Sequence, residues 1–163
     1  MAPLRVSFAG GGTDLPEYYE GSDFGHVVSA AINQYVYVHL KRHNPIFSEK
    51  YRISYSEIEH CQDISEIKNS IVSACLKVTE FDEPVQISTS ADLPAHSGLG
   101  SSSSFAVALI TAIHEMRDEK VSKYQIAEEA FAAERHFAKV KCGKQDHFAS
   151  AFGGINSLKF FGN

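Results

Sequence analysis

The apolar residues at the start of the chain lie at every second position. Leu4, Val6 and Phe8 alternate with polar residues, which is the pattern of a half-buried strand. The same alternation predicts more strands, with a turn at Asn33-Gln34 between the first two of them. These strands are expected over 27–32, 35–40, 51–56, 85–90 and 155–161. The polar segment 57–65 has no periodicity from which an element can be predicted.

Apolar residues three or four positions apart predict the helices. This spacing indicates a helix over 66–80, and an unbroken apolar run indicates another over 105–116. A serine followed three residues later by a glutamine is a capping box, which opens a third helix over 122–137. The chain therefore mixes strands and helices, as an α+β domain does.

Glu134 falls near the apolar stripe of the third helix. An unpaired carboxylate is costly in such a position, so Glu134 needs a positively charged partner. Arg135 and Lys139 are ordinary candidates, and a bound Mg²⁺ ion is the functional one.

A glycine- and serine-rich loop joins the strand over 85–90 to the apolar helix. The first amides of a helix lack partners within it and carry partial positive charge, so a flexible loop at this point can hold phosphate groups. A serine-rich linker is the plain alternative, but a linker would not lead directly into so apolar a helix. A Walker A loop requires a lysine where Ser101 stands, and a dinucleotide fingerprint requires a glycine where Ser103 stands.

A second glycine loop, Gly10-Gly11-Gly12, follows the first strand. Three successive glycines let the backbone approach a ligand closely, and Thr13 and Asp14 border the loop. Arg5 could be an ordinary cation of the strand and Asp14 an ordinary turn cap.

Composition narrows the classes of function. The 163 residues suit one domain, and a net charge of −5 argues against a nucleic-acid surface. No apolar run reaches the length of a membrane span, and the N-terminus lacks the layout of a secretion signal. Three widely spaced cysteines suggest free thiols in the cytoplasm rather than disulfides or a zinc site. Eight histidines do not change this, because only His39 and His43 lie four apart, in a strand.

Three motifs in order resemble those of the GHMP kinases, the family of galactokinase, homoserine kinase and mevalonate kinase. Pro-x-x-x-Gly-Leu-Gly-Ser-Ser, beginning at Pro94, is similar to the family's ATP-binding motif. Ala-Pro-Leu-Arg-Val followed by Gly-Thr-Asp is similar to its first motif, with differences from galactokinases at Leu4, Gly11 and Gly12. Glu134 followed twelve residues later by Asp146 within Cys-Gly-x-x-Asp-x-Phe is similar to its third segment.

The resemblance implies a role for each motif. Asp146 would orient or deprotonate a sugar hydroxyl, and Arg5 would offset charge on the transferring phosphoryl group. Ser102 and Glu134 would bind Mg²⁺. The residues expected to bind the ATP phosphates are Pro94, Ser97, Gly98, Leu99, Gly100, Ser101, Ser102 and Ser103. Those expected to contact the sugar are Gly12, Thr13, Asp14 and Gly143.

The resemblance also implies a fold and a substrate class. Residues 1–163 would form an N-terminal domain like the second domain of ribosomal protein S5, its sheet covered by helices, and the family's C-terminal domain would be absent. The triple glycine before Thr13 is most like the kinases of D-glycero-D-manno-heptose 7-phosphate, which would be phosphorylated at the anomeric hydroxyl. Fucose- or galactose-type kinases and a non-catalytic sensor of ATP and sugar stay open. For a sugar phosphate, the candidate cations are Lys41, Arg42, Arg52 and Lys144.

Overall fold

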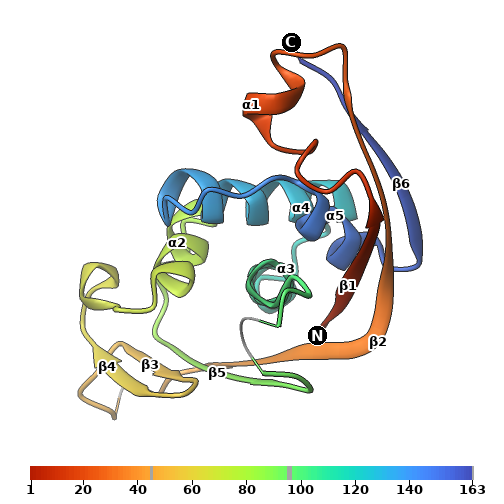
Figure 1. Ribbon diagram of the computed structural model, residues 1–163. Helices are drawn as coiled ribbons and strands as arrows, with labels where there is room; N and C mark the ends of the chain where they lie inside the picture. Colours follow the sequence, from red (N-terminus) through yellow and green to blue (C-terminus); the bar gives the residue numbers. More distant parts are fainter. Residues whose placement is uncertain (45, 95–96, 163) are drawn as a thin grey trace.

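One mixed sheet of six strands carries the molecule, and the long helices lie on its concave side (Figure 1). The structure is a computed structural model that describes residues 1–44, 46–94 and 97–162. The strands are β1 (Ala2–Ala9), β2 (Gly25–Arg42), β3 (Tyr51–Ser54), β4 (Ile58–Cys61), β5 (Val85–Ala91) and β6 (Ile155–Phe160). The helices are α1 (Pro16–Tyr19), η1 (Ile64–Glu66), α2 (Ser70–Val78), α3 (Ser101–Met116), α4 (Lys123–Ala132), η2 (Ala133–Phe137) and α5 (Gln145–Phe152).

β2 is a single strand, and the predicted turn at Asn33-Gln34 is wrong. Asn and Gln without a neighbouring glycine or proline do not force a reversal, and partners on both halves keep the backbone extended. The first half of β2 pairs with β1 and β6, while the second half pairs with β5. Two irregularities in the β1 pairing accompany a bend that curves the sheet around α3 (Figure 1).

The remaining strands extend the sheet from β5. Its order is β1-β2-β5-β3-β4, with β6 on β2, and of these pairs only β3 and β5 run parallel. A parallel pair needs a crossover connection, which here passes through β4, η1 and α2. The segment 57–65, for which no element could be predicted, thus supplies an edge strand and a short capped turn.

The core lies between this sheet and α3. Leu109, Ile110 and Ile113 of α3 are fully buried. Leu4 of β1 and Ile87 of β5 lie on the sheet side of the core and are at most 1% exposed. The predicted strands over 4–8, 51–56, 85–90 and 155–161 and the apolar helix are therefore confirmed. The α+β fold with helices covering the sheet is confirmed as well.

The helix predicted over 66–80 begins later, at Ser70. Asn69 ends the preceding turn because its side chain accepts a hydrogen bond from the amide of Val72 at 3.1 Å. The amide nitrogens of Lys68 and Asn69 instead donate to the buried Glu59 carboxylate.

The helix predicted over 122–137 changes geometry near its end. The Ser122 hydroxyl accepts from the Gln125 amide, but the Gln125 side chain donates to Glu129, so only half of the capping box forms. After Ala132 the backbone widens into a π turn over η2, which contains Glu134. Such turns frequently occur at functional sites.

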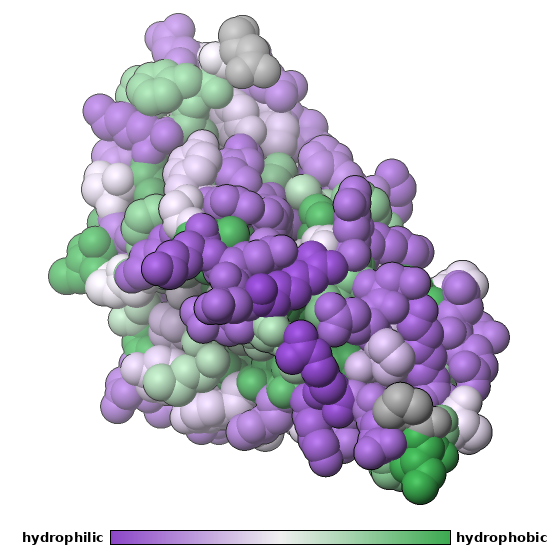
Figure 2. Space-filling view, turned by 180° about the vertical axis from the view of Figure 1, so that it is seen from behind, coloured by the Kyte–Doolittle hydropathy of each residue, from purple (hydrophilic) through white to green (hydrophobic). Residues whose placement is uncertain are grey.

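The surface is mixed. Figure 2 shows a band of hydrophilic side chains across one face, with apolar side chains in separate groups. Among the described residues, no helix has both the length and the apolar character needed to cross a membrane.

His114 joins the end of α3 to α4. Its Nδ1 lies 2.6 Å from a Glu119 oxygen and its Nε2 lies 2.6 Å from a Glu129 oxygen. Burial alone would lower the pKa of His114, but the two carboxylates outweigh it, and the pKa is raised. The imidazolium form therefore holds α3 and α4 together.

This clamp predicts a pH-dependent stability. Because the folded-state pKa of His114 is raised, its stabilisation is fully present below the unfolded value of about 6.5 and is lost as pH rises through the folded value. His114→Gln should destabilise the chain by about 1–3 kcal/mol at about pH 6 and much less at about pH 9. Urea unfolding at both pH values measures this, with the exposed His60→Gln as control. Equal losses at both pH values would contradict the clamp.

Candidate functional site

The glycine loop before α3 turns its backbone toward a cavity. Gly98 and Gly100 have left-handed backbone conformations, with φ of 75° and 77°, which other residues adopt only with strain. Gly100 is the N-cap of α3, and no side chain in the described part of the chain caps this end. The first amides of the 16-residue helix are therefore free for an anionic ligand, with the helix dipole behind them.

Arg5 fastens three elements at this loop. Its Nε and Nη2 donate to the two Asp146 carboxylate oxygens at 2.6 and 2.7 Å, a bidentate pair. Its Nη1 donates to the Gly98 carbonyl at 2.9 Å, and its backbone amide donates to the Leu99 carbonyl at 3.0 Å. β1, the glycine loop and the first turn of α5 are thus held in one arrangement.

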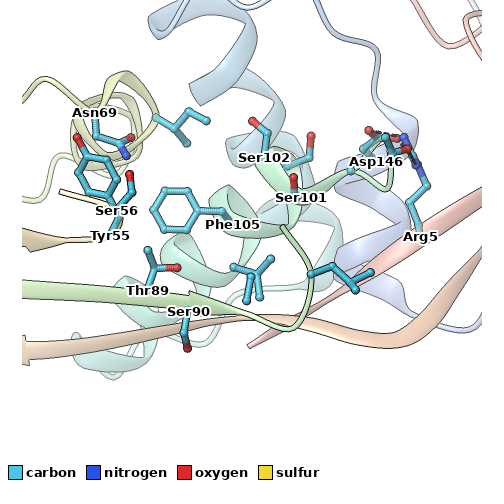
Figure 3. A pocket seen from close by; sticks show the side chains of 17 residues that line it. Arg5, Tyr55, Ser56, Asn69, Thr89, Ser90, Ser101, Ser102, Phe105 and Asp146 are labelled. Atoms are coloured by element: carbon cyan, nitrogen blue, oxygen red, sulfur yellow. Dashed lines mark hydrogen bonds and ion pairs between the residues drawn. The ribbon is translucent and has the colours of Figure 1, made fainter. Parts of the chain in front are cut away.

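A cavity of about 690 Å³ opens on this arrangement (Figure 3). Arg5 and Asp146 stand at one end, Ser101 and Ser102 in the middle, and Tyr55 and Asn69 at the other end. Its full lining is Arg5, Val36, Tyr55, Ser56, Asn69, Ile71, Thr89, Ser90, Ala91, Leu93, Gly98, Gly100, Ser101, Ser102, Ser103, Phe105 and Asp146. One end is therefore ionic, and the other mixes aromatic, aliphatic and amide groups.

The predicted phosphate-binding residues divide into two groups. Those that line the cavity are Gly98, Gly100, Ser101, Ser102 and Ser103. Pro94, Ser97 and Leu99 lie outside its lining in the described part of the chain. The Leu99 carbonyl is instead the acceptor that fixes the loop to β1.

The serines at the start of α3 point in different directions. Ser102 and Ser103 both donate their hydroxyls to Glu134, the second at 2.7 Å. Ser104 donates to the Pro3 carbonyl at 2.9 Å and contacts the Ser150 hydroxyl at 2.7 Å. Ser103 and Ser104 are buried, whereas Ser102 is exposed. Ser102 alone thus joins the cavity to Glu134 with an exposed hydroxyl.

Glu134 is a buried carboxylate with several donors. It is 1% exposed, and His147, which is fully buried, directs its Nε2 to the carboxylate at 2.6 Å. Burial would raise the pKa of Glu134, but the bonds from His147, Ser102 and Ser103 outweigh it and lower the pKa. Glu134 is therefore an ionised carboxylate held beside the cavity.

Of the partners that the sequence suggested for Glu134, the two side chains Arg135 and Lys139 do not pair with it. Arg135 points away and pairs with Glu17 at 2.5 Å, and Lys139 is exposed. The π turn shifts the side-chain directions in this segment, and His147 of α5 is the hydrogen-bond partner of Glu134 instead. The sequence offered one signal for His147, its position directly after Asp146 on a short helix.

Asp14 fixes the second glycine loop to α5. It is 2% exposed and accepts hydrogen bonds from the amides of Gly12 and Gln145 at 3.1 and 2.9 Å. A Cβ atom on Gly143 would lie 2.0 Å from an Asp14 oxygen, so only glycine fits there. The Thr13 hydroxyl donates to the Gly10 carbonyl at 2.8 Å, while Gly12 is exposed. The expected sugar-contacting residues are thus gathered beside Asp146, with Asp14 serving as a cap of α5.

The other end of the cavity had no sequence signal. Tyr55, Asn69, Ile71 and Phe105 come from four segments, and no short motif connects them. Asn69 also caps α2.

Of the four candidate cations for a sugar phosphate, only Lys144 adjoins the expected sugar site. Lys144 pairs with Glu128 at 2.8 Å. Arg42 pairs with Glu83, and Arg52 pairs with Glu49, at the opposite end of the sheet. Lys41 precedes Arg42 on β2.

Known proteins are similar to this chain in sequence and in fold. Residues 69–154, more than half of the chain, match the family described as the GHMP kinases N terminal domain. The chain is 34% identical to D-glycero-alpha-D-manno-heptose 7-phosphate kinase of Campylobacter jejuni, covering all of this chain and 50% of the relative. It is 30% identical to galactokinase of Thermotoga petrophila, covering 93% of this chain and 43% of the relative. The chain thus spans about half the length of the curated relatives it matches.

Solved structures agree on the fold. The crystal structure of a D-glycero-D-manno-heptose 1-phosphate kinase from Bacteroides thetaiotaomicron superposes with a TM-score of 0.87 at 29% identity, covering 99% of this chain and 56% of that one. Lactococcus lactis galactokinase complexed with galactose superposes with a TM-score of 0.78 at 18% identity, covering 96% of this chain and 43% of that one.

Gly143→Ala tests the contact between the second glycine loop and α5. The added Cβ must displace the Asp14 carboxylate, and we expect a loss of about 1–3 kcal/mol in unfolding free energy, as for an overpacked site. Gly21→Ala is the matched control, because its Cβ would meet nothing closer than 3.9 Å. Chemical unfolding measures both variants. If the unfolding free energy of Gly143→Ala is unchanged, this close contact does not constrain the loop.

Proposed function

The chain belongs to the GHMP kinase N-terminal domain family, and on that premise we propose that it forms the ATP-binding, N-terminal half of a sugar kinase. The proposed substrate is D-glycero-D-manno-heptose 7-phosphate, phosphorylated at its anomeric hydroxyl. The observation that carries the proposal is the convergence of an ion pair and a serine–carboxylate contact on one cavity. The Arg5–Asp146 pair and the Ser102–Glu134 contact both border it, beside the free amides of α3.

The cavity suits ATP in size and in polarity. Drug-sized ligands occupy pockets of about 300–1,000 Å³, and this cavity has about 690 Å³. Tyr55, Ile71 and Phe105 offer a surface for a flat base, while the amides from Gly98 to Ser103 lie where phosphates would bind. Pro94 and Ser97 would shape the loop rather than bind phosphate directly.

Ser102 and Glu134 fit a magnesium ion. Mg²⁺ prefers oxygen ligands and commonly takes one or two carboxylates together with phosphate oxygens. A hydroxyl and an ionised carboxylate already meet here, at the edge of the cavity. The ion would neutralise charge on the phosphates. His147 and Ser103 would hold Glu134 in place for it.

Asp146 would act on the sugar hydroxyl. Each of its oxygens accepts one hydrogen bond from Arg5 and keeps a lone pair for the hydroxyl proton. Arg5 fixes the orientation of the carboxylate and adds positive charge where the phosphoryl group would pass. Gly12, Thr13, Asp14 and Gly143 would border the sugar, the buried Asp14 mainly by positioning its neighbours.

The heptose phosphate is favoured over galactose by similarity and by one cation. The full-chain match to the C. jejuni heptose 7-phosphate kinase supports it, as does the triple glycine before Thr13. Lys144, next to Gly143, would offer a charge for the sugar's phosphate. ATP chemistry and free cysteines are in keeping with a cytoplasmic reaction.

The proposal is tested by ATP turnover with Mg²⁺ against heptose 7-phosphate, galactose, fucose and mannose. The assay should use this chain beside any longer polypeptide that contains it. Turnover with the heptose phosphate alone supports the proposal in full, whereas turnover with another sugar keeps the kinase and rejects the substrate. Binding of ATP and sugar without transfer in the longer polypeptide would favour a sensor.

Asp146→Asn should keep ATP binding and lower turnover about 10²–10⁴-fold, because the amide orients a hydroxyl but does not take its proton. Calorimetric titration with ATP and a steady-state assay separate the two effects. Asp118→Asn is the matched control, since Asp118 is exposed, lies outside the cavity lining and has a left-handed backbone that asparagine tolerates. Full activity of Asp146→Asn would reject the assignment.

Ser102→Ala should raise the Mg²⁺ concentration for half-maximal turnover roughly tenfold or more, as the loss of a metal-site group does. Ser101→Ala is the control, because Ser101 lines the same cavity and lies beside Ser102 in the chain. If the Mg²⁺ requirement shifts in Ser101→Ala and not in Ser102→Ala, the neighbouring serine is the ligand instead.

A further inference from the structure

Three side chains of different elements converge behind the cavity. One ligand atom each from Glu134, Cys142 and His147 lie within 4.8 Å of one another. Glu134 belongs to η2 and His147 to α5, while Cys142 lies in the loop between them. The sequence disfavours a zinc site because its cysteines are widely spaced, and the fold supplies the proximity that spacing does not reveal.

Two groups of this cluster, the Cys142 thiol and the Nδ1 atom of His147, have no role in the proposed kinase reaction. His147 is fully buried, and its Nδ1 has no hydrogen-bond partner among the described residues. The Cys142 thiol is free, and the residue is partly exposed, which gives solvent ions a route to the cluster. The ring nitrogen that faces Glu134 is Nε2, so an ion shared with Glu134 would bind at Nε2 and replace the present hydrogen bond.

The set of ligands suits zinc and not magnesium. Thiolate, imidazole and carboxylate are the groups that bind Zn²⁺, at about 2.0–2.3 Å, whereas Mg²⁺ takes oxygens. Tetrahedral bonds of that length separate ligand atoms by roughly 3.3–3.8 Å, which requires only small side-chain movements from the observed spread. One carboxylate, one thiolate and one neutral imidazole would balance the charge of the ion. The thiol proton would leave to solvent on binding.

We propose that Glu134, Cys142 and His147 form a binding site for Zn²⁺ or a similarly soft divalent cation, and that this site shares Glu134 with the Mg²⁺ pair. Ser102 and His147 contact different oxygens of Glu134, so zinc in this site would place a second dication on the same carboxylate and oppose Mg²⁺ binding by charge repulsion. The effect on Mg²⁺ rests on the proposed function, but the zinc site does not.

Direct metal binding to the 163-residue chain tests the site without any assay of activity. Competition with a chromophoric chelator gives the Zn²⁺ affinity, and Co²⁺ serves as a spectroscopic substitute because a thiolate ligand gives it a charge-transfer band. Cys142→Ala removes a partly exposed ligand with little risk to folding, and His147→Gln removes the imidazole. Cys61→Ala is the matched control, because Cys61 is a free cysteine on β4, away from the cluster.

We expect one Zn²⁺ per chain, an affinity at least about tenfold weaker in Cys142→Ala, and no change in Cys61→Ala. The cobalt band should disappear only with Cys142. Unchanged affinity in Cys142→Ala, an absent band, or an equal loss in Cys61→Ala would overturn the site.

The link to magnesium is tested separately. If the longer polypeptide is an active kinase, Zn²⁺ should raise its Mg²⁺ requirement, and Cys142→Ala should relieve this effect. If zinc binds through Cys142 but the Mg²⁺ requirement is unchanged, the two metal sites do not share Glu134. If the longer polypeptide binds zinc but has no kinase activity, the result counts against the proposed kinase and not against the zinc site.

Discussion

The arrangement of the cavity depends on the guanidinium of Arg5. One planar group donates to both oxygens of Asp146 and to the Gly98 carbonyl, so it joins an N-terminal strand to a loop and to a helix more than 90 residues away. A lysine has a single charged nitrogen without this planar geometry and could not hold the carboxylate in a fixed plane. The backbone amide of the same residue holds Leu99, so the strand and the side chain fix the loop together.

Glu134 is the second constraint, and it acts through the first turn of α3. A buried ionised carboxylate persists only when donors surround it, and here they come from the first turn of α3 and from α5. The π turn directs Glu134 toward these donors and separates it from Arg135, its neighbour in sequence. The start of α3, which is proposed to bind phosphate, therefore also positions Glu134, the proposed metal ligand, together with α5.

Much of this architecture could be predicted from local pattern. Alternation predicted β1, β3, β5 and β6, and the apolar run predicted the helix that follows the glycine loop. Anion binding at this loop stays a prediction. Features that depend on distant partners were not predictable. β2 continues through Asn33 because β1 pairs with residues before and after it, and β5 pairs with β2 from Val36 onward. α2 starts late because the Glu59 carboxylate accepts hydrogen bonds from the preceding amides.

The site shows the same limit. Arg5, Ser102, Glu134 and Asp146 could be proposed because each belongs to a motif that resembles one of the GHMP kinases. Ser102 and Asp146 also lie in the first turn of a helix, where sequence carries a local signal. His147 could not, since its role arises from a contact across two helices.

The two glycine loops are coupled through α5. Asp14 caps this helix at Gln145, and Asp146, the next residue, is held by Arg5. A displacement of Asp14 would therefore move the carboxylate proposed to receive the sugar proton, even though Asp14 itself is buried. His147 follows Asp146 and carries the same movement to Glu134. Three consecutive residues of α5 thus connect the loop proposed for the sugar, the proposed acceptor of its proton and the proposed metal ligand. The chemistry proposed for the site therefore depends on the rigid start of α5, which places these groups relative to one another.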